Sequence, residues 1–220
     1  MINAIRSFSR KLSANSSGIA LTEFAAVAPV FLTLGMFGFE VANLATSKMR
    51  VSQIAMSLAD NASRLGQTDN SSVSPTVTED EVEAVLKGAL LQGASINLEA
   101  NGRLILSSLE YDVYTDKQYI HWQRCVGSAT RASQYGDEGT NNGLSGASLP
   151  GMGTAPNVVV APQGSAVMYV ELVYTYTPVF ASPFGKSADI VEEAAFIVRD
   201  DRDIGEYDEK GLAGTKKNGC

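Results

Sequence analysis

The sequence predicts an α+β protein in which one long, apolar N-terminal helix precedes a small antiparallel sheet. Two observations carry this prediction. Between Glu23 and Glu40 lie sixteen residues without a charge, inside an apolar run that extends over residues 18–45. Beyond residue 100, several segments are rich in β-branched and aromatic residues and are bounded by polar, Gly-rich stretches, which is the pattern of strands joined by turns and loops.

The apolar run is long enough to cross a bilayer, which takes about 20 apolar residues in a helix. Residues 1–18 carry three basic side chains and no acid, so the positive-inside rule places the N-terminus in the cytoplasm and the rest of the chain across the membrane. Glu40 follows Glu23 by about 25 Å along a helix, at about 1.5 Å per residue. It is therefore expected at the far interface of the bilayer, as a boundary residue.

The same patterns divide the chain into four parts: a basic leader over residues 1–18, a membrane helix over 19–45, a helical extension over 46–66 and an α+β domain over 67–220. The extension carries an apolar stripe at helical spacing. We expect this stripe to pack on its own domain, and a coiled-coil seam with another subunit is the alternative. Its members are Val51, Ile54, Ala55, Leu58, Ala62 and Leu65.

Within the α+β domain, Thr78 and Glu81 have the spacing of a capping box and predict a short helix that ends at Gly93. The strand pattern predicts a hairpin and two later strands, with a further short edge strand inside a Gly-rich loop over residues 126–164. A loop of that length is usually functional or mobile. The predicted strands span residues 103–113, 119–125, 158–160, 166–177 and 190–199, with a turn over residues 115–117.

The charge and the cysteines narrow the classes of function. The formal net charge is -7, which argues against a nucleic-acid partner because phosphate binding needs clustered lysine and arginine. Cys125 and Cys220 are the only two cysteines. An even count in a chain that crosses a membrane predicts a disulfide in an oxidising compartment, with two unrelated thiols as the alternative.

No residue pattern indicates catalysis. His121 is the single histidine and has no serine or cysteine arrangement beside it. Asp200, Asp201 and Asp203 offer oxygen atoms but do not follow the calcium-loop pattern. We therefore expect a protein that is not an enzyme and that needs no metal or cofactor.

The start of the apolar run carries a resemblance to a known family. Residues 18–24 read GIALTEF directly after the basic leader, and an Ala-Pro-Val-Phe-Leu segment follows within the helix. This arrangement is similar to the processing site of type IV pilin-like proteins, and the fuller run resembles the TadE-like minor pilins of tight-adherence (Flp) pilus systems. The likeness covers the first forty-odd residues. Less specific features of the later chain agree with it: Trp122-Gln-Arg-Cys125, Tyr174-x-Tyr176-x-Pro178 and the near-terminal cysteine.

The resemblance implies that a prepilin peptidase cuts after Gly18 and leaves Ile19 as the mature N-terminus. It also implies that Glu23 and Phe24 take part in pilin assembly, with Glu23 in the first turn of the helix, where a carboxylate suits the helix dipole. The implied partners are other pilins and pseudopilins, the peptidase and a secretion platform in the bacterial inner membrane. The folded domain would then lie in the periplasm, with incorporation into an extracellular pilus as a further expectation.

An ordinary signal sequence is the alternative. Small residues at Ala26-Val27-Ala28 or Ala45-Thr46-Ser47 resemble sites for a signal peptidase. The protein would then be a signal-anchored periplasmic binding module that uses the Gly-rich loop over residues 126–164 as its contact surface. The mature N-terminus separates the two readings, because Ile19 indicates the pilin route, and Thr46 or Lys48 a signal peptide.

Overall fold

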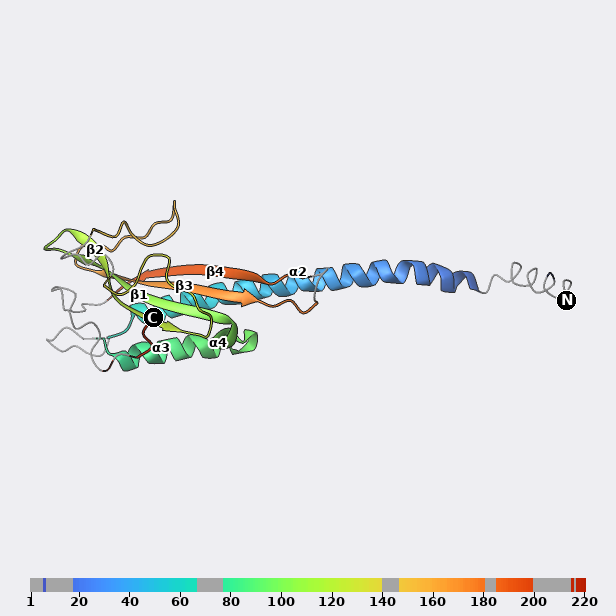
Figure 1. Ribbon diagram of the computed structural model, residues 1–220, viewed down its shortest axis with the longest axis horizontal. Coiled ribbons are helices and arrows are strands. Elements are labelled where there is room, and N and C mark those ends of the chain that lie inside the picture. The colour runs from blue at the N-terminus through green and yellow to red at the C-terminus, as the bar shows by residue number, and fades with distance from the viewer. Residues whose placement is uncertain are drawn as a thin grey trace. The chain divides into compact units, whose positions relative to one another are not determined.

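The structure is a computed structural model that describes residues 6, 18–66, 77–139, 147–180, 185–199, 215 and 217–220. It divides into two compact units, one of Met1–Leu44 with Pro178–Lys186 and one of Ala45–Thr177 with Ser187–Cys220. The elements, in chain order, are α2 (Ile19–Ser63), α3 (Glu79–Gln92), the 3-10 helix η2 (Ala94–Ile96), α4 (Leu98–Asn101), β1 (Gly102–Asp112), β2 (Lys117–Val126), β3 (Ala166–Tyr176) and β4 (Ala188–Ile197) (Figure 1).

Helix α2 has 45 residues and continues through Pro29. It ends three residues before the predicted boundary at residue 66: Arg64 and Leu65 donate backbone hydrogen bonds three residues back, and Gly66 adopts a φ of 84°. A left-handed glycine of this kind is a common way to end a helix, since it has no Cβ to strain. The prediction of one long helix is therefore confirmed, with a small correction at its C-terminal end.

The second half of α2 packs on its own domain, as expected. Every residue of the predicted stripe is buried in one core together with the side chains that face it from the sheet and from α3. Leu58 is only 1% exposed. The apolar stripe is thus covered by the chain itself.

The sheet has four strands in the order β2-β1-β3-β4, and every neighbouring pair is antiparallel. The predicted hairpin is confirmed as β1 and β2, with a register shift between Ser108 and Leu109. One face of β3 enters the core as predicted, with Met168, Val170, Leu172, Tyr174 and Tyr176. The predicted strand at residues 158–160 is wrong, because only an isolated bridge between Met152 and Val159 forms there.

The opposite face of the sheet has a core of its own. It gathers side chains from β1, β2 and β3 with others from the Gly-rich loop: Leu109, Ile120, Leu149, Met152, Ala161, Val167 and Tyr169. Gly151 makes the tight turn of that loop possible, since its φ is 124° and a Cβ there would lie 2.6 Å from the Val159 carbonyl oxygen. The described part of the loop therefore covers the sheet instead of standing free in solvent.

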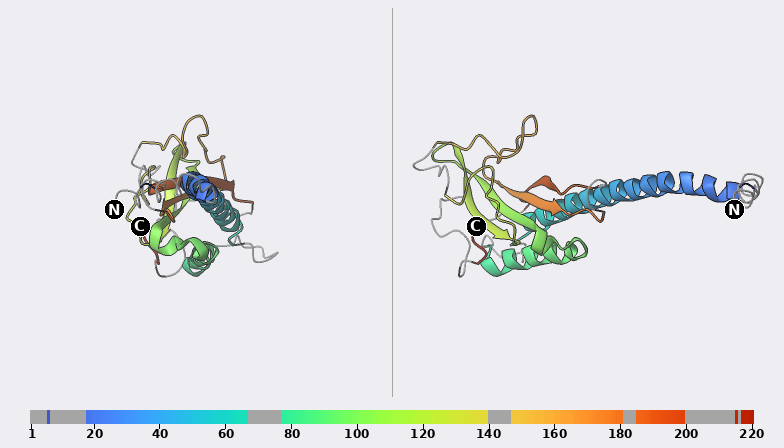
Figure 2. Two further views of the ribbon diagram at one scale, coloured as in Figure 1. Left: turned by 90° about the vertical axis from the view of Figure 1, so that its right-hand side faces the viewer. Right: turned by 45° about the vertical axis from the view of Figure 1, so that its right-hand side comes forward.

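Helix α3 lies alongside the strands of the first face, and Figure 2 shows it in green beneath the yellow-green strands β1 and β2. Its capping box is present as predicted. The backbone N–H of Thr78 donates to Glu81 Oε2 at 2.8 Å, and the Glu81 backbone N–H donates to Thr78 Oγ1 at 3.3 Å. Both orphan donors at the start of the helix are thereby satisfied.

Candidate functional site

The predicted processing and assembly residues lie at the start of α2. Gly18 directly precedes the helix, and Ile19, Glu23 and Phe24 occupy its first two turns. All four are exposed, and a Cβ at Gly18 would meet nothing within 4 Å. Within the described part of the chain, no neighbouring atom therefore demands a glycine at position 18.

One expectation about Glu23 needs correction. The first turn of α2 contains no acidic residue, because the helix begins at Ile19 and Glu23 is its fifth residue. Glu23 lies one helical turn beyond Ile19, at the spacing where side chains share a face. The carboxylate of Glu23 therefore interacts only weakly with the helix dipole, which acts mainly within the first turn.

The first half of α2 exposes large apolar side chains all round. Phe31 is 72% exposed and Leu34 is 64% exposed. Among the described residues, α2 is the one helix long and apolar enough to cross a membrane, with a most apolar window of mean hydropathy 1.8 and no part of that window buried. An exposed apolar helix near an N-terminus indicates a membrane anchor or a signal sequence.

Glu40, the expected boundary residue, has partners within the chain that the sequence does not indicate. It is 4% exposed, and its Oε2 accepts hydrogen bonds from the backbone N–H groups of Val179 at 3.1 Å and Phe180 at 3.0 Å. The Phe180 ring also meets the Phe39 ring edge to face, with centroids 5.8 Å apart. No local signal indicates this arrangement, since the partners lie 139 and 140 residues further along the chain.

The predicted disulfide is confirmed. Cys125 and Cys220 are bonded, with their Cα atoms 5.0 Å apart and a sequence separation of 95. The tail follows the outer edge of β2, where the Cys125 backbone N–H donates to the Asn218 carbonyl oxygen at 2.7 Å and Arg124 forms a bridge with Gly219. A disulfide of this kind indicates an oxidising compartment outside the cytoplasm.

A charge cluster that the sequence did not predict lies beside the disulfide, with Arg124 and Glu79 buried and Lys217 exposed. The Arg124 guanidinium donates to the Glu79 carboxylate, with Nε 2.9 Å from Oε2, and to Glu138 Oε2 at 2.8 Å. The Lys217 ammonium donates to Glu83 Oε2 at 2.9 Å. Burial lowers the pKa of Arg124, but its hydrogen bonds to Glu79 and the charge of Glu138 outweigh burial and leave that pKa above its ordinary value. The cluster ties the tail and α3 to β2.

The His121 side chain contacts the carboxylate of Glu110 on the neighbouring strand β1. Its Nδ1 lies 2.9 Å from Glu110 Oε2, and Ser108 Oγ donates to the other oxygen of that carboxylate at 2.6 Å. Among the described residues, no group of three or more His, Cys, Asp or Glu side chains is placed to hold a metal ion. Asp200, Asp201 and Asp203 lie outside the described residues. That the protein is not an enzyme stays a prediction.

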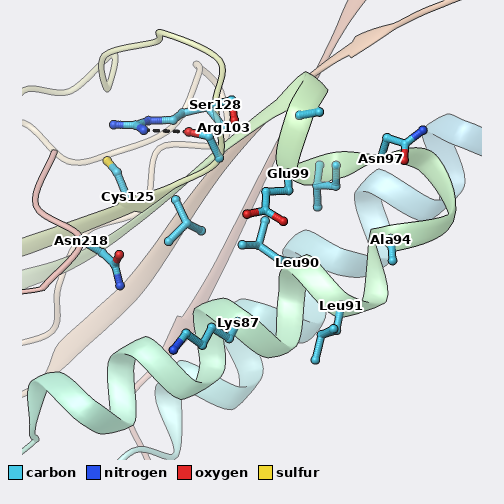
Figure 3. Close-up of a pocket in the computed structure, with 14 residues that line it drawn as sticks. Lys87, Leu90, Leu91, Ala94, Asn97, Glu99, Arg103, Cys125, Ser128 and Asn218 are labelled. Carbon is cyan, nitrogen blue, oxygen red and sulfur yellow. Dashed lines mark hydrogen bonds between the residues drawn. The ribbon is translucent and has the colours of Figure 1, made fainter.

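A cavity of about 890 Å³ lies between α3 and the first two strands (Figure 3). Leu90 and Lys87 line it from α3, and Arg103 and Val126 line it from the strands. Arg103 Nη1 donates to the Gly127 carbonyl oxygen at 3.0 Å, whereas Arg103 Nε is buried without a hydrogen-bond partner among the described residues. The lining mixes apolar groups with both signs of charge and does not define one ligand chemistry.

Comparison of the chain with models of protein families, with curated proteins and with solved structures found no match. The class of protein therefore follows from the architecture alone. A long, apolar N-terminal helix leads into a four-stranded antiparallel sheet, and a disulfide pins the C-terminal tail. This architecture is pilin-like.

Proposed function

We propose that the chain is a minor pilin or pseudopilin of a tight-adherence pilus system, cut by a prepilin peptidase after Gly18. The observation that carries the proposal is the exposed apolar half of α2, which begins with the sequence GIALTEF. An apolar helix whose large side chains stay exposed among the described residues is suited to rest in a bilayer and then to pack against identical or similar helices. The pilin-like architecture supports the same class.

The chemistry of the helix start explains how such a protein would assemble. Cleavage after Gly18 gives Ile19 a free α-ammonium group at the edge of the bilayer, where an unpaired charge is costly. The carboxylate of Glu23, one turn away, can neutralise the ammonium of its own chain or of a neighbouring subunit. The second pairing sets the register between subunits, and the adjacent Phe24 adds apolar contact area. The partners are other pilins and pseudopilins, met at an inner-membrane secretion platform.

The mature N-terminus tests the proposal directly. Sequencing the N-terminus of protein purified from its native membrane should give Ile19. The alternative is a signal-anchored binding module, which the described part of the Gly-rich loop supports by presenting Val158 and Val160 at the surface. An N-terminus at Thr46 or Lys48 would favour that alternative and exclude the pilin route.

Glu23→Leu tests the assembly role. We expect the variant to insert and to be cut after Gly18, since the apolar run and the glycine remain, but to be lost from complexes with the other pilins. Co-purification and pilus counts by microscopy measure the loss. Thr33→Leu is the matched control, because it adds the same side chain at another exposed polar position of the helix and leaves Glu23 in place. Normal association and piliation in Glu23→Leu would remove the assembly role.

A further inference from the structure

The connection between β3 and β4 contacts the N-terminal helix at Glu40. The carboxylate of Glu40 accepts the backbone N–H groups of Val179 and Phe180, so these two donors need no water. Gly185 closes the contact from the other end of the connection, because a Cβ there would lie 3.1 Å from Glu40 Cδ and 2.4 Å from Pro178 Cβ. Glu40 therefore binds one flank of the connection, and the other flank lies close to its side chain.

Apolar side chains surround the two backbone N–H groups that Glu40 accepts. Val179 is 58% exposed although its N–H is bonded, and Phe180 lies against Phe39, which is itself largely exposed. Lys186, which follows Gly185, is exposed as well. We name the exposed Val179 and Lys186, together with the half-buried Phe180, the Glu40 collar. A collar of apolar and aromatic groups with one ammonium is the composition of chain segments at a membrane interface.

The collar also lies at the distance along α2 at which a membrane interface is expected. Ile19 and Glu40 lie about 31 Å apart along α2 at about 1.5 Å per residue, and the hydrocarbon core of a bilayer is about 30 Å thick. With Ile19 at the inner boundary, Glu40 falls at the outer one. The apolar surface of the collar is also continuous with the exposed apolar surface of α2, through the contact between Phe180 and Phe39.

We infer that the Glu40 collar is a second membrane contact. Val179 and Phe180 enter the outer interface of the bilayer that α2 crosses, and Lys186 meets the lipid phosphates. Glu40 is the positioning residue that sets the depth of the collar. The inference rests on the membrane anchor of the proposed function, but it assigns a lipid contact to a segment that begins 139 residues beyond Glu40 in sequence.

Depth-dependent quenching tests the inference. Both native cysteines are in the disulfide, so Val179→Cys gives one free thiol for an environment-sensitive NBD label without reduction. The labelled full-length protein is reconstituted in vesicles of phosphatidylethanolamine and phosphatidylglycerol with lipids brominated near the glycerol end of the acyl chains. We expect a blue-shifted emission and a clear loss of intensity. Phe31→Cys is the reference for the membrane helix, and Val158→Cys, at a valine 43% exposed in the other unit, is the matched control.

Two variants of Glu40 distinguish its role in positioning the collar from the role of α2 as the membrane anchor. Glu40→Gln keeps an oxygen that accepts the Val179 and Phe180 N–H groups, so quenching at position 179 should persist. Glu40→Leu removes the acceptor and should lower the quenching at position 179 towards that of the Val158→Cys control, while quenching at position 31 stays. An unchanged emission of Trp122 in each variant shows that the sheet domain is folded.

Three outcomes would overturn the inference. If the label at position 179 behaves like the label at Val158 while the label at Phe31 is quenched, the collar does not touch lipid but the anchor stands. If the label at Phe31 is not quenched either, the anchor and the collar both fail. If the label at position 179 becomes shielded only when other pilins are added, the collar is a protein contact.

Discussion

The two halves of α2 form one continuous helix, yet they meet different surroundings. Residues 19–44 expose their large side chains all round, whereas residues 45–63 bury a stripe against the sheet of their own domain. Leu34 and Leu58 illustrate the difference, since they are 64% and 1% exposed. An amphipathic helix is completed by its own fold, and one that is apolar on every side needs a cover from outside the chain.

The two glutamates of the apolar half of α2 also differ in their surroundings. Glu23 is exposed at the start of the helix, and Glu40 is buried by backbone groups from the distant connection between β3 and β4. Residue type and apolar neighbours are alike in the two cases. What separates them is whether the chain returns to the helix at that position.

Removal of the disulfide should have the largest effect, because it should destabilise the sheet domain and leave the exposed half of α2 unchanged. Replacing Cys125 and Cys220 together by serine should lower the free energy of unfolding of the sheet domain by about 4 kcal/mol, since the bond closes a long loop in the unfolded chain. Denaturant unfolding in detergent, followed by the fluorescence of Trp122, measures the change. Circular dichroism should show that the exposed half of α2 stays helical after the sheet domain unfolds. Loss of all helix in one transition would contradict the comparison.

A matched pair of leucines tests the comparison within the helix. Leu58→Ala should lower the free energy of unfolding by about 3 kcal/mol, because it leaves a cavity in the core. Leu34→Ala should change it by less than about 0.5 kcal/mol, as substitutions at surfaces usually do. The same Trp122 transition reports both variants. Equal losses would mean that the chain also covers the first half of the helix.

The smallest expected effect concerns the sheet face that α2 does not cover. Burial raises the pKa of the Glu171 carboxyl above its ordinary value of 4.5, although hydrogen bonds from the Gln134 N–H and the Ser133 hydroxyl act in the opposite direction. The folded protein thus binds this proton more tightly than the unfolded chain does. The resulting contribution to stability is complete below pH 4.5 and is lost as the pH rises through the folded pKa.

Glu171→Gln isolates that contribution, because its amide does not titrate and its oxygen still accepts the hydrogen bond of Gln134. The free energy of unfolding of the wild type, relative to the variant, should fall as the pH rises from about 4 to about 8. Urea unfolding at a series of pH values gives the difference. Parallel profiles for the two proteins would show that the loop over this face admits water to Glu171.

The sequence by itself determined the elements whose signals are local. The capping pair Thr78 and Glu81 marked the start of α3, and the alternation along β3 assigned its buried face correctly. The length and charge of the first apolar run indicated the exposed helix, and the compartment argument indicated the bond between Cys125 and Cys220. The sequence shows these signals because the side-chain periodicity of helices and strands, and the capping of helices, involve residues only a few positions apart.

Only the tertiary structure decided which distant groups meet. It placed β3 beside β1, packed the Gly-rich loop onto the second face of the sheet, and brought Arg124 to Glu79. It also brought the backbone N–H groups of Val179 and Phe180 to the Glu40 carboxylate. Buried charges and backbone donors must find partners, but many segments of a chain offer them. Which segment supplies the partner depends on how the whole chain packs, and no pattern within a few residues encodes that choice.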